Sequence, residues 1–157
     1  MKWFVVKCVL VVWLFVMISG FISSSKVENV NFDTLVQNVK SAGDTEGMTE
    51  VDSLKIKEFY GINRDDYEGV ILLKGEDTMD VREILIVKAL SKEQANSLET
   101  AVNDRKEKQL KSFEGYGVEQ TKLLNDSVIS VEGVYVLFAV SPDSQNFYDA
   151  FYNTIKK

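Results

Sequence analysis

The sequence predicts an α+β fold, with an antiparallel sheet of about four strands in two hairpins, helices packed on one face, and a hydrophobic helix before the domain. Two observations predict this fold. Four short segments rich in β-branched and aromatic residues occur as two pairs, each joined by a short connection. Segments with apolar residues at helical spacing precede, separate and follow these pairs.

The N-terminal residues 1–25 are predicted to form a signal peptide or a membrane anchor. Residues 3–22 are apolar or small except for one lysine, and their length approaches the roughly 20 residues needed to cross a bilayer. The bulky run without alanine near its end favours an uncleaved anchor, whereas the serines that follow it would allow cleavage near Lys26. Lys2 and Lys7 favour a position of the N-terminus on the inner side of the membrane. Residues 26–157 are therefore expected to form a single extracytoplasmic domain, held at the cell membrane or secreted.

Composition limits the chemistry of this exported part. It contains no histidine, and the one cysteine of the chain, Cys8, lies in the apolar segment. Thiol nucleophiles, disulfides and imidazole-based catalysis are therefore excluded from residues 26–157. Without Lys2 and Lys7, 16 of the 18 basic residues remain against 24 acidic residues, a net charge of −8. Such a charge disfavours nucleic acid, whose affinity comes largely from basic contacts with phosphates.

The first half of the domain is predicted to contain two helices and a hairpin. Apolar residues recur at helical spacing in 32–39 and in 53–60, where the second helix ends at a glycine. Residues 42–50 between them contain two glycines and no periodicity, which predicts a loop. Apolar segments follow at 70–74 and 82–90, and the turn between them is too short for a parallel crossover, so the two strands must be antiparallel.

The second half is predicted to contain a long helix, a short helix, a second hairpin and a last helix. Ser91 and Gln94 have the spacing of a capping box, which begins a helix of about 23 residues. The hairpin covers residues 128–140 with its turn at 132–133. The Ser-Pro-Asp sequence at 141–143 is typical of a helix start, with the serine as its cap.

The segment KSFEGYG, residues 111–117, is predicted to end the long helix. Gly115 provides a left-handed residue just past the helix, and Tyr116 is expected to pack back on Leu110. A phosphate-binding loop would need a strand before it and a Lys–Ser/Thr pair after it, and this segment has neither.

Carboxylates are the remaining candidates for chemistry. The acidic loop from Asn63 does not match a calcium-binding loop, which needs Gly at position six and Glu at position twelve, because Glu68 and Lys74 stand there. A pair of carboxylates could serve a hydrolase, but no pattern places two of them across a cleft. The acids considered for such a pair are Glu58, Asp65, Glu76 and Glu83. We therefore predict no catalytic residue, no metal site and no cofactor.

The candidate interaction residues are four basic residues of the long helix and two tyrosines of the last helix: Arg105, Lys106, Lys108, Lys111, Tyr148 and Tyr152. The basic residues could contact anionic headgroups or wall polymers near the anchor. Neighbouring acids at helical spacing also allow them to form ion pairs at a solvated helix end. The tyrosines belong to an aromatic helix face, which serves either as core or as a binding surface.

Four segments follow one another in an order more specific than any single motif: YGINRDDYEGVILL (60–73), REILIVKAL (82–90), RKEKQLKSFEGYGVEQTKLL (105–124) and VISVEGVYVLFAVSPD (128–143). In this order the chain resembles the DUF4358 family, a domain of unknown function, over roughly residues 31–152. The resemblance implies an exported or membrane-anchored protein, mainly of Gram-positive bacteria, and implies no activity, substrate or catalytic residue. Many relatives resemble lipoproteins, but Cys8 at the start of the apolar run disfavours lipidation here.

These observations favour a non-enzymatic, extracytoplasmic domain that is associated with the membrane through residues 3–22. Its expected partner is an unidentified protein or cell-envelope component, and not nucleic acid. The alternative is a sensor or binding domain for a small molecule or a divalent cation, with acidic loops or the aromatic helix lining a pocket. A carboxylate-based hydrolase is the third hypothesis.

Overall fold

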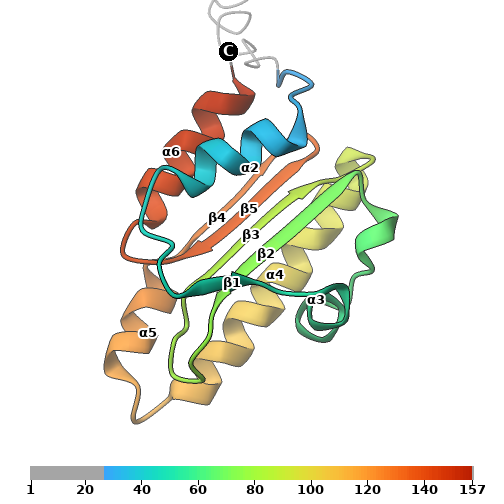
Figure 1. The fold of residues 1–157 in the computed structure, drawn as a ribbon. Helices are drawn as coiled ribbons and strands as arrows, with labels where there is room; N and C mark the ends of the chain where they lie inside the picture. Colours follow the sequence, from blue (N-terminus) through green and yellow to red (C-terminus); the bar gives the residue numbers. More distant parts are fainter. Residues whose placement is uncertain (1–26, 157) are drawn as a thin grey trace, which may run out of the picture.

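The computed structural model describes residues 27–156 (Figure 1). The predicted N-terminal hydrophobic helix, with its alternatives of signal peptide and anchor, lies outside the described residues. Among the helices that are described, none is both long and apolar enough to cross a bilayer. The described residues have an α+β fold with a five-stranded antiparallel sheet.

The sheet has the strand order β1-β2-β3-β5-β4, and every pair of neighbouring strands is antiparallel. The chain passes from β3 through two helices to the far edge of the sheet, and then returns to place β5 between β3 and β4. In chain order the elements are α2 (Phe32–Lys40), β1 (Met48–Glu50), α3 (Ser53–Tyr60), the short 3-10 helix η1 (Arg64–Asp66), β2 (Gly69–Gly75), β3 (Glu83–Lys88), α4 (Lys92–Phe113), α5 (Val118–Asn125), β4 (Val128–Glu132), β5 (Tyr135–Val140) and α6 (Ser144–Ile155).

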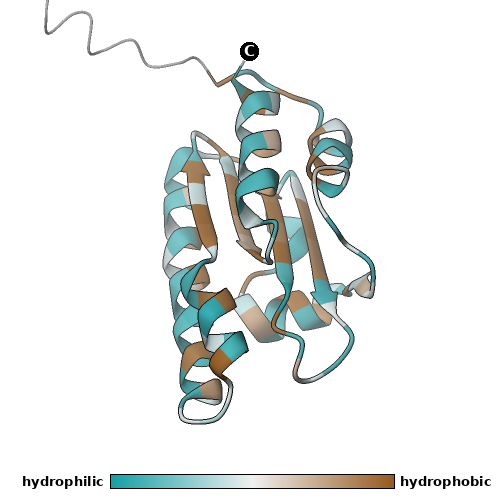
Figure 2. Ribbon diagram, turned by 90° about the vertical axis from the view of Figure 1, so that its left-hand side faces the viewer, coloured by the Kyte–Doolittle hydropathy of each residue, from teal (hydrophilic) through white to brown (hydrophobic). Residues whose placement is uncertain are grey.

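Helices cover both faces of the sheet, so the prediction that they pack on one face is wrong. Alternate residues such as Leu85 and Phe138 contact α3, α4 and α5, whereas Ile84 and Leu137 contact α2 and α6. Figure 2 shows the hydrophobic strands lying between helices on the two sides. The physical reason is that β3 and β5 are apolar without interruption by polar residues, and such strands must be covered twice.

The sheet has five strands because Met48–Glu50, which were expected in a loop, form the edge strand β1. This strand pairs with residues Leu73–Gly75 of β2. Gly47, with a φ of 72°, turns the chain into it. The three side chains of β1 are exposed or half-buried, so the strand is held by its backbone pairing and leaves no apolar pattern in the sequence.

Side-chain caps begin α2 and α4, and the cap predicted at Ser91 is confirmed. The Asn31 side chain accepts a hydrogen bond from the Thr34 N–H at 3.1 Å, and Ser91 Oγ accepts one from the Gln94 N–H at 3.1 Å. The reciprocal half of the capping box is shifted by one residue, because Gln94 Oε1 accepts from the N–H of Leu90, at 2.8 Å. Helix α6 begins at Ser144, with Asp143 before it, so the prediction that Ser141 caps this helix is wrong.

The turn that ends α4 is confirmed, but its packing differs from the prediction. Glu114 has φ −58° and ψ 124° and Gly115 has φ 87°, which are the angles of a type II turn. Because the helix already ends at Phe113, Tyr116 lies against the Phe113 ring, with ring centroids 5.8 Å apart, and not on Leu110 as predicted. The β4–β5 turn likewise falls one residue later than predicted, since Glu132 still pairs with Tyr135.

The two ends of α4 lie at opposite ends of the molecule (Figure 1). Residue 27 enters beside the start of this helix and beside the end of α6, where the Glu28 N–H donates to the Ile155 carbonyl at 2.9 Å. Helix α4 contains 22 residues and is about 33 Å long. Its C-terminal turns are therefore far from the point where the chain enters.

The Gly69→Ala substitution is expected to lower the free energy of unfolding by about 1–3 kcal/mol, because a Cβ at this position would lie 2.5 Å from the Phe32 ring. Urea denaturation measures the change. The matched background is Phe32→Ala, which removes the ring and should abolish most of the cost. An equal cost in both backgrounds would show that Phe32 does not pack on Gly69.

Candidate functional site

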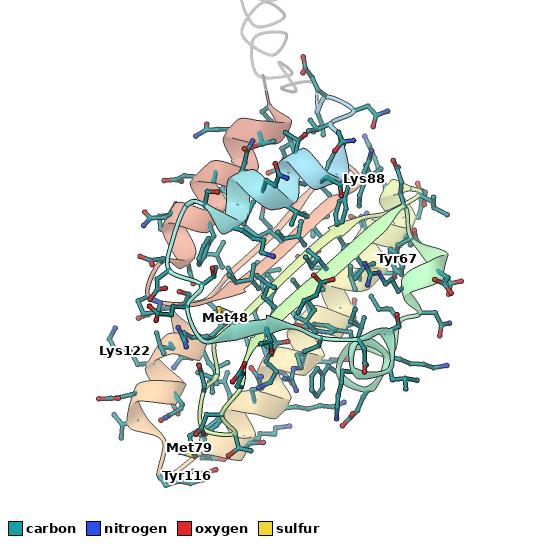
Figure 3. All side chains as sticks on the ribbon, in the orientation of Figure 1. Met48, Tyr67, Met79, Lys88, Tyr116 and Lys122 are labelled. Carbon is teal, nitrogen blue, oxygen red and sulfur yellow. The ribbon has the colours of Figure 1, made fainter. Side chains whose placement is uncertain are left out.

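The candidate site is a cleft of about 550 Å³ at the free edge of β2, which we call the edge cleft. Phe32 and Val36 of α2 line it on one side and Tyr67, which follows η1, lines it on another. Val70 and Ile71 of β2 lie between these walls. Figure 3 shows Tyr67 beside the start of β2, next to η1.

The edge of β2 is free here because β1 is shorter than β2. Strand β1 pairs with Leu73–Gly75, and one further backbone bond joins the Val51 N–H to the Leu72 carbonyl at 3.0 Å. The next residue, Asp52, caps α3 by accepting from the Lys55 N–H at 2.9 Å. Helix α3 therefore takes the chain away from the sheet before it can pair with Gly69–Ile71.

The backbone of Val70 points into the edge cleft. In an antiparallel strand the N–H and C=O groups of successive residues point to alternate sides. Leu72 faces β1, so Val70, two residues earlier, faces the same side, where no strand pairs with it. Val70 is 1% exposed, so side chains around the cleft shield these groups from water. A buried backbone group without a partner costs about 1–3 kcal/mol, which favours any ligand that pairs with it.

Carboxylates outnumber cations around this backbone. Asp33, Glu50, Asp65 and Glu68 line the edge cleft together with one guanidinium, that of Arg64. The Arg64–Glu50 contact is long, at 3.8 Å, and both side chains are more than 40% exposed, so it adds little stability. The edge cleft therefore has a net negative charge and could attract a cation.

Lys88 joins the edge cleft to the N-terminal end of the described chain. Its buried ammonium group lies 2.6 Å from a carboxylate oxygen of Glu68, and it donates to the Asn29 side chain at 2.7 Å and to the Val30 carbonyl at 3.0 Å. The segment just after residue 27 is thereby fixed next to the edge cleft. Figure 3 shows Lys88 at the same end of the sheet as Tyr67.

A second polar cluster, which we call the Glu83 cluster, is buried between β3, α3 and α4. Glu83 is fully buried, and its two carboxylate oxygens accept hydrogen bonds from the Tyr60 hydroxyl, from Arg105 Nη2 at 2.9 Å and from Gln109 Nε2 at 2.9 Å. The Arg105 guanidinium also lies over the Phe59 ring, 4.3 Å from its centroid. These contacts tie two helices to the central strand.

The electrostatics of the Glu83 cluster favour neutral Tyr60 and charged Arg105. Burial, together with the negative charge of Glu83, raises the pKa of Tyr60 well above its usual value. Burial alone would lower the pKa of Arg105, but the hydrogen bond and charge of Glu83 outweigh it, so the pKa is raised. Glu83 is thus the counter-ion of Arg105. A substrate could reach it only if α3 or α4 moved, so this carboxylate supports the fold.

The other acids considered for a hydrolase lie apart from Glu83 on separate elements. Glu58 is on α3 and forms an exposed ion pair with Lys55 at 2.8 Å. Asp65 lies in η1 at the edge cleft, and Glu76 is exposed in the β2–β3 turn. Within the described part of the chain, no group of three or more acidic, histidine or cysteine side chains is placed to hold a metal ion.

The structure separates the predicted interaction residues. Arg105 is bound to Glu83, whereas Lys108 and Lys111 are exposed on the last turns of α4, with Lys106 half-buried beside them. Among the described side chains, none of these three lysines forms an ion pair with an acid. They lie at the end of the domain away from residue 27 (Figure 1). The predicted contact of these basic residues with anionic headgroups or wall polymers stays a prediction.

Tyr148 and Tyr152 lie on α6, across the sheet from α4. Their rings are in contact, with centroids 5.7 Å apart, and the Lys156 ammonium lies 4.5 Å from the centre of the Tyr152 ring. Lys156 also pairs with Glu132 at 2.8 Å. Both tyrosines are half-buried and form part of a packed, charged surface. Neither they nor the basic residues line the edge cleft.

Sequence reasoning missed the edge cleft because it missed β1. The signal that could have found it is the order Glu50-Val51-Asp52. A helix cap at Asp52 fixes the residue at which any strand before it must end. In the register with β2, a strand that ends before Asp52 stops opposite Leu72, and this leaves Gly69–Ile71 free.

The Glu83→Gln substitution is expected to lower the free energy of unfolding by about 3–5 kcal/mol, because it leaves the Arg105 guanidinium buried without an anion. Urea denaturation of the full chain measures this change in the free energy of unfolding. Glu58→Gln is the matched control, since it removes the same charge from an exposed pair and should change stability little. Equal effects of the two substitutions would contradict the role of Glu83 as a buried counter-ion.

The comparisons with known proteins find one family. The family model described as "Domain of unknown function (DUF4358)" matches residues 41–141. This range includes all five strands with α3, α4 and α5, and leaves out α2 and α6. No curated protein and no solved structure matches the chain. Because the match covers well over half of the sequence, the chain belongs to the DUF4358 family.

Proposed function

We propose that this chain is a non-enzymatic, extracytoplasmic domain that binds a protein partner in the edge cleft at the membrane surface. Residues 3–22 hold it at the membrane, or direct its secretion if they are cleaved. The observation that supports the proposal most directly is the edge cleft itself, where an unpaired stretch of β2 lies among excess carboxylates. Unpaired strand edges are common places for one protein to bind another.

The position of the edge cleft supports a partner close to the membrane. Lys88 fixes Asn29 and Val30 next to Glu68, which lines the cleft. A domain carried by residues 3–22 would therefore present the edge cleft near the point of attachment. The basic turns of α4 would face away from it.

The chemistry of the described acids supports a binding role over a hydrolase. Among the described residues, the most enclosed carboxylate, Glu83, accepts hydrogen bonds from three side chains that hold α3 and α4 in place. The acids of the edge cleft are exposed and surround a backbone edge. A general acid usually needs an apolar environment that raises its pKa, and an apolar pocket of that kind does not surround them.

The alternative, a sensor for a small molecule or a divalent cation, rests on the size and charge of the same cleft. Its volume of about 550 Å³ lies within the range of ligand sites, and its excess of carboxylates would attract a positively charged ligand. Such a ligand would bind the isolated full chain without any partner protein.

Site-specific photo-crosslinking in the native membrane tests the proposal. A photoreactive residue replaces Asp65 at the edge cleft or, as a control, Lys122 on α5. A defined adduct is expected from position 65 and not from 122, and the further substitution Glu50→Lys should reduce its yield by about fivefold or more because it opposes a basic partner.

Adducts of equal yield from both positions, or none from either, would contradict binding in the edge cleft. A thermal-shift screen of the full chain with calcium, magnesium and small metabolites distinguishes the alternative. A saturable shift that is lost in the Asp65→Asn/Glu68→Gln variant, with no adduct at position 65, would replace the protein partner by a small ligand.

A further inference from the structure

We propose that the partner inserts an extended, lysine- or arginine-bearing segment that pairs with β2 at Val70 as an added strand. This inference rests on the proposed function and adds to it the chemistry and conformation of the bound segment. It follows from three features of the edge cleft: the direction of the β2 backbone, the walls beside it, and the sign of the charge.

The backbone provides the first feature. Residues Gly69–Ile71 have no strand on their outer side, over a length of about 10 Å. The bonds from Val51 to Leu72 and from Glu76 to Gly47 show that the even-numbered residues of β2 face this side. Val70 therefore offers one donor and one acceptor in the orientation that an added strand requires. A strand here would continue the line of β1 beyond the point where Asp52 turns the chain into α3.

The walls of the cleft provide the second feature. A strand alternates its side chains between two faces. One face would meet Phe32 and Val36 of α2, and the other would meet Tyr67. These three side chains give each face an apolar part on which the stem of a long side chain can lie, with its charged end among the surrounding carboxylates. An extended segment with alternating apolar and basic residues fits this arrangement.

Charge provides the third feature and decides the kind of partner. Asp33, Glu50 and Asp65 surround the free edge, and Arg64 is held by a single long contact that a binding segment can replace. A second copy of this chain would bring more negative charge, since residues 26–157 carry a net charge of −8. A basic segment of another protein is attracted instead.

Two synthetic peptides test the added strand on the full chain. Both have the sequence Ac-Lys-Val-Thr-Val-Lys-Val-amide with a fluorescent label, and they carry N-methyl groups on either the odd or the even amides. Only alternate amides of a paired strand face β2. One methylated peptide should therefore bind like the unmodified peptide in fluorescence anisotropy, and the other should bind about fivefold more weakly or not at all.

A matched pair of variants locates the binding. The double variant Asp65→Asn/Glu50→Gln should weaken binding of the unmodified peptide by about fivefold at low salt. The control Glu107→Gln/Glu114→Gln removes two exposed charges at the far end of α4 and should leave the affinity unchanged. Val70→Pro removes the outward N–H and keeps the ladder with β3, so it should weaken binding. Because Val70 belongs to the buried core, the melting temperature of this variant is expected to fall as well, and binding is measured below that temperature. If the Val70→Pro variant fails to fold, the comparison of the two methylated peptides still tests whether the bound segment pairs with β2.

Equal binding of the two methylated peptides would show that the segment does not pair with β2 as a strand. Binding would then depend on the charge of the edge cleft, and the proposed function would stand. Failure of every peptide to bind, with a cleft-specific adduct still formed in cells, would overturn this inference alone. Sedimentation of the chain as a dimer that the Val70→Pro variant abolishes would replace the basic segment by a second copy. If no peptide binds and no crosslinked adduct forms at position 65, the proposed function is overturned as well.

Discussion

Strand β3 is buried on both faces along its whole length, and the rest of the fold is arranged to meet that constraint. Helices must cover both sides of the sheet, and charges can occur only at the two ends of the strand. Glu83 at one end binds α3 and α4 through Tyr60 and Arg105. Lys88 at the other end binds the segment after residue 27 and the loop before β2. The two buried charges thus attach the outer layers to the central strand.

The edge cleft results from a competition between two kinds of hydrogen bond. After Val51 the chain could continue along β2, but the Asp52 carboxylate begins α3 and takes the backbone away. Helix α3 is needed because Ile56 and Tyr60 cover the central strands. Covering the face of the sheet therefore leaves part of its edge uncovered. The family match includes both α3 and this edge but not α2, which provides one wall of the cleft.

The sequence predicted those features that depend on local chemistry. The helix start at Ser91 and the turn at Gly115 were predicted, because a cap or a positive φ requires particular residues at fixed spacing. The second helical layer and β1 were not predicted, because each depends on contacts between distant segments. Arg105 shows the same limit at the site: among lysines it resembles part of a basic surface, and only the fold places it against Glu83.

Amide hydrogen exchange at Val70 in the full chain, measured by NMR, tests the free edge most directly. The neighbouring amide of Ile71 faces β3 and is paired there with Ile86, whereas the amide of Val70 faces the edge cleft. Although Val70 is 1% exposed, its amide should exchange about tenfold or more faster than that of Ile71 when no partner is present. Equal protection of the two amides would show that the edge of β2 is already paired, and would contradict a binding site at this edge.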